Sequence, residues 1–197
     1  MNAERNADRA AQDAKPAPRL HKTVVLVGMM GAGKTAVGTA MARILGVPFL
    51  DSDEEIVRAA NRTIAEIFER EGEPFFREKE AQVIGRLLRG PPCILSTGGG
   101  AFMSDRNRGR FAEAGVALCL RADLVLLWNR VRHKSTRPLL RTADPRGTLA
   151  ELLARRGPVY ALAEVVVDAE PGLPVEAMAR KVIAALSVRA DVVETAG

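Results

Sequence analysis

Short apolar runs alternate along the chain with longer segments in which apolar residues recur every three or four positions. The short runs predict β-strands that are covered on both faces, and the longer segments predict amphipathic helices. The predicted strands are residues 23–27, 48–50, 93–96, 116–120 and 165–167. Because strands and helices alternate, the sequence predicts an α/β fold of βαβ units with one parallel, five-stranded sheet.

The helical pattern covers residues 34–45, 53–60, 64–70, 74–88, 106–114, 124–132, 149–155 and 175–186. Residues 133–147 contain two prolines and show no clear period, which predicts a mobile loop between helices. The length of 197 residues fits a single domain. We expect this domain to span residues 21–188, between a disordered tail at 1–20 and a flexible tail at 189–197.

The composition favours a soluble protein that binds small anions. Lys and Arg number 29 and Asp and Glu 24, and the resulting net charge of +5 suggests an anionic partner. Aromatic residues make up only 4% of the chain, so stacking platforms for single-stranded nucleic acid are not evident. No apolar run approaches the roughly 20 residues that span a bilayer. We therefore expect neither a nucleic-acid nor a membrane partner.

The two cysteines, Cys93 and Cys119, each lie inside an apolar stretch and not at the spacing of metal ligands. They are predicted to be core thiols of a protein in a reducing compartment. Residues 1–20 lack the apolar core of a secretory signal. These features together predict a cytoplasmic protein.

A phosphate-binding loop is predicted at residues 28–35, whose sequence GMMGAGKT matches GxxxxGK[ST] between the first strand and its helix. In such loops the glycines let backbone N–H groups converge on phosphate oxygens. Lys34 would reach the β- and γ-phosphates, and Thr35 could ligate Mg²⁺. The alternative, a glycine-rich turn without a ligand, is disfavoured by the strand and helix around the motif. The residues expected to bind ATP here are Gly31, Ala32, Gly33, Lys34, Thr35 and Ala36.

Two carboxylates, Asp51 and Asp53, end the second predicted strand on the same side, where open α/β sheets bind ligands. One can orient Mg²⁺, directly or through water, while the other accepts a hydrogen bond or a proton from an attacking hydroxyl. The alternative is that Asp53 only caps the next helix. The spacing alone leaves both interpretations open.

Several further segments follow the phosphate loop in an order that resembles the shikimate kinase family over about residues 21–186. They are FLDSD at 49–53, IAEIF at 64–68, GEPFFREKE at 72–80, TGGGA at 97–101, RPLL at 137–140 and RGPVY at 156–160. The resemblance implies a three-layer P-loop kinase fold with strand order 2-3-1-4-5. It also implies transfer of the γ-phosphoryl group of MgATP to the 3-hydroxyl of shikimate, a step of chorismate and aromatic amino-acid biosynthesis.

The resemblance also implies roles for individual side chains. Asp53 corresponds to the aspartate that holds the acceptor hydroxyls and is the candidate base, and Asp51 is the candidate metal ligand. Arg77 and Arg156 correspond to the arginines that bind the substrate carboxylate, and a guanidinium matches a carboxylate with two parallel hydrogen bonds. Glu80 lies one helical turn from Arg77 and could hold it in position. For a lone Arg, a solvated surface charge is the alternative.

Other implied roles involve the loops. Gly98, Gly99 and Gly100 would let the backbone approach the substrate ring and donate an amide, although an ordinary turn after a strand is the alternative. Arg137 is the candidate lid residue that closes on the transferred phosphoryl group, with a solvated basic loop as the alternative. Arg130 corresponds to the cation that stacks on adenine. The substrate-binding region would cover about residues 51–89 and the lid about residues 133–147.

Two rival functions follow from the same motifs. Another small-molecule P-loop kinase, acting on gluconate or a nucleoside monophosphate, would not need two arginines that converge on a carboxylate beside three glycines. A ligand-sensing regulator would need a DNA-reading module, and a tail of about 20 residues is too short for a helix-turn-helix domain. We therefore expect an enzyme that binds ATP, Mg²⁺ and shikimate. We also expect it to be a monomer.

Overall fold

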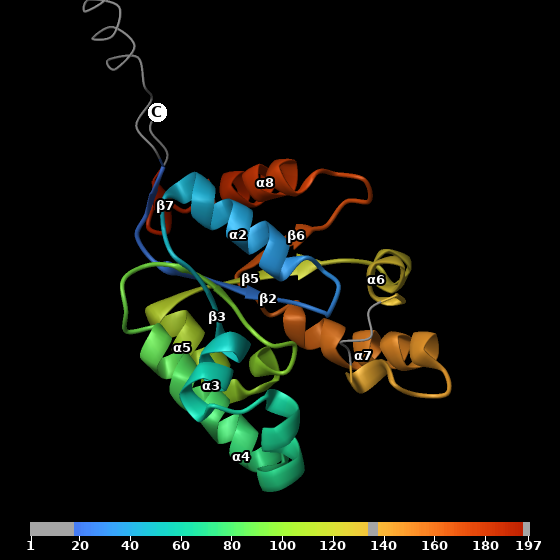
Figure 1. Cartoon of the computed structure of the whole chain (residues 1–197). Coiled ribbons are helices and arrows are strands. Elements are labelled where there is room, and N and C mark those ends of the chain that lie inside the picture. The colour runs from blue at the N-terminus through green and yellow to red at the C-terminus, as the bar shows by residue number, and fades with distance from the viewer. Residues whose placement is uncertain (1–17, 134–137, 195–197) are drawn as a thin grey trace, which may run out of the picture.

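The computed structural model describes residues 18–133 and 138–194 (Figure 1). Its main sheet consists of the parallel strands β2 (Thr23–Val27), β3 (Phe49–Asp51), β4 (Ile94–Ser96), β5 (Gly115–Arg121) and β6 (Val165–Asp168). These five strands lie in the order β3-β4-β2-β5-β6. Numbered along the chain within this sheet, the order is 2-3-1-4-5, so the predicted α/β fold and topology are confirmed.

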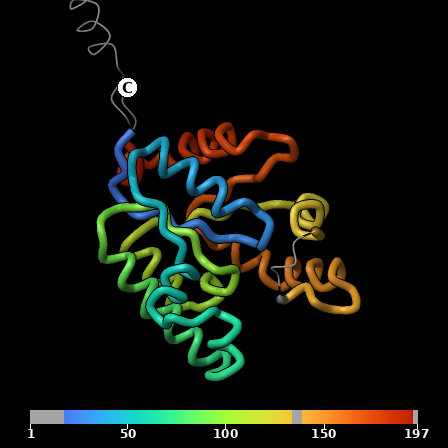
Figure 2. The backbone as a smooth tube through the Cα atoms, viewed as in Figure 1, coloured from blue at the N-terminus to red at the C-terminus, as the bar shows by residue number. Residues whose placement is uncertain are grey.

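Helices cover both faces of this sheet, which explains why its central strands are continuous apolar runs. The helices are α2 (Lys34–Leu45), α3 (Ser52–Ala60), α4 (Ile64–Leu87), α5 (Asp105–Ala114), α6 (Leu124–Val131), α7 (Pro145–Tyr160) and α8 (Val175–Ser187). The tube view shows α2 and α8 side by side on one face, with α4 and α5 on the other (Figure 2). Val24, Val25 and Leu26 of β2 are fully buried between the two layers.

The long helix α4 is bent at one glycine. Gly72 has φ 80° and ψ 174°, and Pro74 opens the second half of the helix. A capping box begins the first half, in which the Thr63 side chain accepts from the backbone of Glu66 and the Glu66 side chain accepts from the backbone of Thr63. The two helices predicted at 64–70 and 74–88 are therefore the two arms of one kinked element.

The predicted loop at 133–147 is wrong at its C-terminal end. Helix α7 begins at Pro145, and Asp144 caps it by accepting a hydrogen bond from the Gly147 backbone at 2.9 Å. Proline is favourable in the first turn of a helix, where its missing N–H costs no hydrogen bond. Residues 138–140 form a short 3₁₀ turn, η2. Residues 134–137 lie outside the described part of the chain.

A second, small sheet pairs the two ends of the described chain. Strand β1 (Arg19–Leu20) runs antiparallel to β7 (Val193–Glu194), with Arg19 opposite Glu194 and Leu20 opposite Val193. Leu20, Val192 and Val193 are buried in the main core. The tails predicted at 1–20 and 189–197 are therefore too long, because residues 19–20 and 192–194 pack on the domain.

Both cysteines are part of the core, as predicted. Cys93 and Cys119 are buried in the cluster that surrounds the main sheet. Burial raises the pKa of both thiols, that of Cys119 to about 11. Among the described helices, none is long and apolar enough to cross a membrane.

Candidate active site

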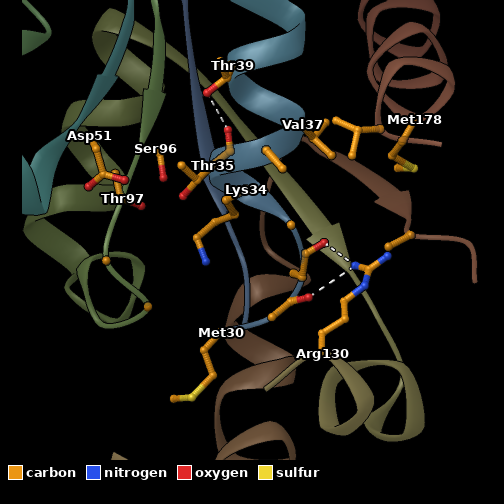
Figure 3. Close-up of a pocket in the computed structure, with 18 of the residues that line it drawn as sticks. Met30, Lys34, Thr35, Val37, Thr39, Asp51, Ser96, Thr97, Arg130 and Met178 are labelled. Carbon is orange, nitrogen blue, oxygen red and sulfur yellow. Dashed lines mark hydrogen bonds between the residues drawn. The ribbon is translucent and has the colours of Figure 1, made fainter. Parts of the chain in front are cut away.

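A cleft of about 720 Å³ opens at the carboxyl ends of β2, β3 and β4 (Figure 3). The phosphate loop forms its centre. The ends of β3 and β4 line one side, and Arg130 with the segment that leads into α8 lines the other. The cleft lies where ligands bind in open α/β sheets, at the point where the strand order reverses beside β2.

The phosphate loop adopts a conformation that requires its glycines. Gly28, Gly31 and Gly33 have φ of 130°, 84° and 106°, a region that residues with side chains rarely adopt. A Cβ on Gly28 would also lie 2.6 Å from the carbonyl oxygen of Leu120. Gly33 directly precedes α2, so the loop presents its amides at a helix N-terminus, which favours an anion.

Lys34 and Arg130 both contact the backbone of this loop. Lys34 Nζ donates to the carbonyls of Gly28 at 2.9 Å and Met29 at 3.2 Å. Arg130 Nη1 donates to the carbonyls of Gly31 at 3.2 Å and Ala32 at 3.0 Å, from the opposite side of the loop (Figure 3). Both cations therefore lie beside the predicted phosphate site.

Asp51 caps helix α3, and Asp53 does not. Asp51 Oδ1 accepts a hydrogen bond from the backbone N–H of Asp53 at 2.9 Å. The alternative interpretation of Asp53 as the helix cap is therefore wrong, because Asp51 already has this position. Asp53 lies in the first turn of α3 and lines the cleft together with Asp51.

Two hydroxyl residues at the end of β4, Ser96 and Thr97, were not predicted as site residues. Ser96 lies opposite Asp51 in the sheet register, and both Ser96 and Thr97 line the cleft close to Thr35 (Figure 3). The Thr97 hydroxyl donates to the carbonyl of Leu26 at 3.1 Å, which ties β4 to β2. Their position directly before the three glycines was the signal that could have identified them.

The glycines after β4 leave room for the predicted acceptor-binding side chains. A Cβ on Gly98 would lie 2.7 Å from Asp53 Oδ1. A Cβ on Gly100 would lie 2.6 Å from both Nη1 and Nη2 of Arg77. Neither glycine has a φ in the left-handed region. Glycine is therefore needed at these positions because a side chain would collide with Asp53 or Arg77, and not because of the backbone conformation.

Arg77 is held by two carboxylates. Its Nη1 donates to both oxygens of Glu80, at 3.1 and 2.9 Å, and its Nε and Nη2 donate to Oε1 of Glu73 at 3.1 and 3.0 Å. Burial opposes the charge of the guanidinium, but the carboxylates outweigh it and raise the pKa of Arg77. Burial also raises the pKa of Glu80, and Arg77 partly offsets this. The expected pair of Arg77 and Glu80 is confirmed.

Arg156 is held by a neutral group. Its Nη1 donates to the carbonyl of Gly99 at 3.3 Å, and the hydroxyl of Tyr160 donates to the same oxygen. Tyr160 is buried against Phe102, and this burial raises its pKa to about 12. Sequence reasoning missed Tyr160, although its position one helical turn after Arg156 was visible.

The structure brings most of the predicted site residues together. The phosphate loop, Asp51, Asp53, Arg130 and the first two glycines of the triplet line one cleft. Arg77, Gly100 and Arg156 do not line it, but they adjoin it through their contacts with the triplet. The predicted lid residue Arg137 lies outside the described residues.

The fold and this site define a P-loop kinase of a small molecule. The family model of shikimate kinase matches residues 30–187, so the chain belongs to the shikimate kinase family. It is 68% identical over 177 residues to a shikimate kinase of Cereibacter sphaeroides, covering 90% of this chain and 88% of that protein. It is 62% identical over 178 residues to a shikimate kinase of Ruegeria pomeroyi, covering 90% and 91%.

A solved structure is also similar to this chain. The structure of shikimate kinase from Acinetobacter baumannii in complex with shikimate has a TM-score of 0.79 and 38% sequence identity. The match covers 85% of this chain and 94% of that chain.

Proposed function

We propose that this chain transfers the γ-phosphoryl group of ATP to the 3-hydroxyl of shikimate, giving ADP and shikimate 3-phosphate. The observation that carries the proposal is the convergence of Asp53, Arg77 and Arg156 on one glycine triplet beside the phosphate loop. Two guanidinium groups suit one carboxylate, and a carboxylate suits a hydroxyl that must be oriented. Shikimate carries both of these groups.

The side chains divide the work of positioning and charge stabilisation that phosphoryl transfer needs. Asp53 orients the acceptor hydroxyl and accepts its proton, while Arg77 and Arg156 bind the acceptor carboxylate. Lys34 leaves the carbonyls of its own loop and neutralises the β- and γ-phosphates. Arg137, in a lid that ends before α7, closes on the transferred group once both substrates are bound.

The donor set at the centre of the cleft fits Mg²⁺. Thr35 at the start of α2 and Asp51 at the end of β3 line the same cleft and supply a hydroxyl and a carboxylate, and Mg²⁺ prefers oxygen ligands and usually takes few from the protein. Bound Mg²⁺ would supply positive charge at the phosphate oxygens. Arg130, together with Leu173 just before α8 and Met178 in α8, would bind the adenine at the other end of the cleft.

An ADP-release assay tests the proposed function. Purified protein with ATP and Mg²⁺ should release ADP when shikimate is added, and Lys34→Ala should abolish most of this activity while the domain stays folded. Gluconate and nucleoside monophosphates are the comparison acceptors. Release with either of them, and none with shikimate, would identify a different small-molecule kinase.

We also propose a domain organisation, an oligomeric state and a cellular compartment for the enzyme. We propose one domain whose acceptor region spans about residues 51–89, acting as a monomer in the cytoplasm. The buried thiols support a reducing compartment. Light scattering should give the monomer mass of 21.2 kDa, and a mass near twice this value would contradict the monomer.

A further inference from the structure

Glu73 occupies an edge of Arg77 that is suited to bind a carboxylate. Arginine forms paired hydrogen bonds through adjacent N–H groups, and the Nε and Nη2 edge is one such pair. Both of these nitrogens donate to a single oxygen of Glu73, at 3.1 and 3.0 Å. Glu80 binds Nη1, at the other side of the guanidinium. The free enzyme therefore already satisfies Arg77 with two acids.

For this reason, the net charge around Arg77 differs from the net charge around Arg156, the other arginine proposed to bind the acceptor carboxylate. Arg77 carries one positive charge against the negative charges of Glu73 and Glu80. Arg156 forms no ion pair within the part of the chain that the structure describes, and its Nη1 contacts the neutral carbonyl of Gly99. A bound carboxylate is thus attracted at Arg156 and meets a net negative group around Arg77.

The two acids around Arg77 differ in their freedom to move. The Glu80 side chain is only 1% exposed, and both of its oxygens contact Arg77. The Glu73 side chain is 63% exposed and uses one oxygen. Glu73 also lies between the bend at Gly72 and Pro74, which opens the second arm of α4. Glu73 can therefore turn into water at low cost, and Glu80 cannot.

We propose that Glu73 is an internal competitor for the acceptor carboxylate and so a determinant of substrate affinity. In the free enzyme its carboxylate occupies the Nε and Nη2 edge of Arg77. When the acceptor binds, the Glu73 carboxylate either moves away from this edge or stays and repels the acceptor carboxylate. In both cases the acceptor binds more weakly than it would without the charge of Glu73. This inference rests on the proposed function, because it needs an acceptor that carries a carboxylate at Arg77.

The opposite role, in which Glu73 holds Arg77 in place, has less support in the contacts. Glu80 fixes Nη1 from within the helix, and the Arg77 guanidinium also lies 5.1 Å from the ring centre of Phe76. These contacts remain when Glu73 is changed. Arg77 is therefore expected to keep its position without Glu73, with its free edge available to a ligand.

Isothermal titration of shikimate without nucleotide tests the inference in the wild type, Glu73→Gln and Glu78→Gln. Glu78 is the matched control, since it lies on the same helix, is exposed and pairs with Arg106 at 2.7 Å. Glu73→Gln should lower the dissociation constant roughly three- to tenfold, as expected for the loss of one partly screened charge a few ångströms away. Glu78→Gln should leave it near the wild-type value. The gain at Glu73 should shrink at high salt.

Other outcomes would contradict the inference. An unchanged or raised dissociation constant in Glu73→Gln would mean that Glu73 supports binding, and an equal gain in Glu78→Gln would mean a general charge effect. The methyl ester of shikimate, which lacks the charge, should bind Glu73→Gln and the wild type equally, and a gain there would also overturn the idea. If the wild type does not bind shikimate at all, the proposed function fails and this inference fails with it.

Discussion

Asp53 is a residue whose two possible roles the structure separates. Since Asp51 caps α3, replacing Asp53 removes no helix cap. Asp53→Asn should therefore leave thermal unfolding nearly unchanged but lower kcat at least about a hundredfold, because the amide cannot accept the proton of the acceptor hydroxyl. Steady-state kinetics with shikimate would measure this, and the rise in KM should be smaller than the fall in kcat.

The control for this prediction is Asp123→Asn. Asp123 caps α6 through the Leu126 backbone and lies outside the cleft, and asparagine is an equally good cap. This variant should keep its kcat. A kcat near the wild-type value in Asp53→Asn as well would show that Asp53 only shapes the cleft.

Tyr160 is the only tyrosine in the sequence, so its titration can be assigned without ambiguity. Burial raises its pKa to about 12, whereas an exposed tyrosine titrates near pH 10. The folded state therefore favours the neutral phenol. The resulting stability is complete below about pH 10 and is lost as the pH rises toward about 12. Absorbance should show almost no tyrosinate in the folded protein near pH 10, and about half in denaturant.

Tyr160→Phe tests the raised pKa of Tyr160 through the free energy of unfolding. The free energy of unfolding of this variant should fall less steeply than that of the wild type as the pH rises above about 10. The variant should also lose about 1 kcal/mol below this range, because Gly99 keeps only its hydrogen bond from Arg156. Equal alkaline slopes in the two proteins would show that the phenol is not buried as described.

At the scale of elements, the small sheet of β1 and β7 is flanked by exposed ion pairs. Asp191 accepts hydrogen bonds from Arg189 and Lys22, which lower its pKa to about 2. A depressed carboxyl pKa stabilises the fold above about pH 4, and this stability is lost as the pH falls through about 2. Asp191→Asn should thus lower the melting temperature slightly near pH 7, and this difference should disappear as the pH falls below about 2.

The control for Asp191 is Glu113→Gln, which removes another exposed charge, from α5. Its melting temperature should not depend on pH in the same way. If Asp191→Asn melts like the wild type across the whole range, these ion pairs do not hold the chain ends together.

Local patterns predicted the main elements because each carries its own signal. The strands of the main sheet are apolar runs, and α2 begins and ends at glycines visible in the sequence. The pairing of β1 and β7 was missed because each strand has two residues and its partner lies at the other chain end. Helix α7 was predicted too short at its N-terminus because Pro145 counted toward the loop predicted at residues 133–147, although this proline lies in the first turn of the helix.

The site was predictable in its composition and less so in its contacts. The phosphate loop, Asp53, Arg77 and Arg156 follow from motifs. The two donors that meet at the Gly99 carbonyl come from a helix 57 and 61 residues further along the chain, and spacing cannot reveal such a contact. The occupation of Arg77 by Glu73 was also missed, because helical spacing permits the pair but does not show which edge of the guanidinium it uses.

At the scale of the whole molecule, the two core thiols report on opening of the domain. Cys93 and Cys119 are buried, and burial raises the pKa of both, so a thiol reagent near pH 8 should react with them only through unfolding. ADP and shikimate are the proposed ligands of the folded form, so adding both should slow this reaction further. Rapid labelling of the native protein would contradict the described burial, and two thiols should react at once in denaturant.

The antiparallel pairing of β1 with β7 also has a consequence for protein engineering. Because Arg19 lies opposite Glu194, the described ends of the chain emerge together on one side of the molecule (Figure 1). A short glycine-serine linker could therefore join them, and new ends could be opened at the exposed turn between Gly90 and Pro91. Such a circular permutant would place the phosphate loop in the second half of the chain while keeping every strand of the main sheet intact. It should retain nucleotide binding, because this site depends on which residues lie close together in the folded protein and not on where the chain starts.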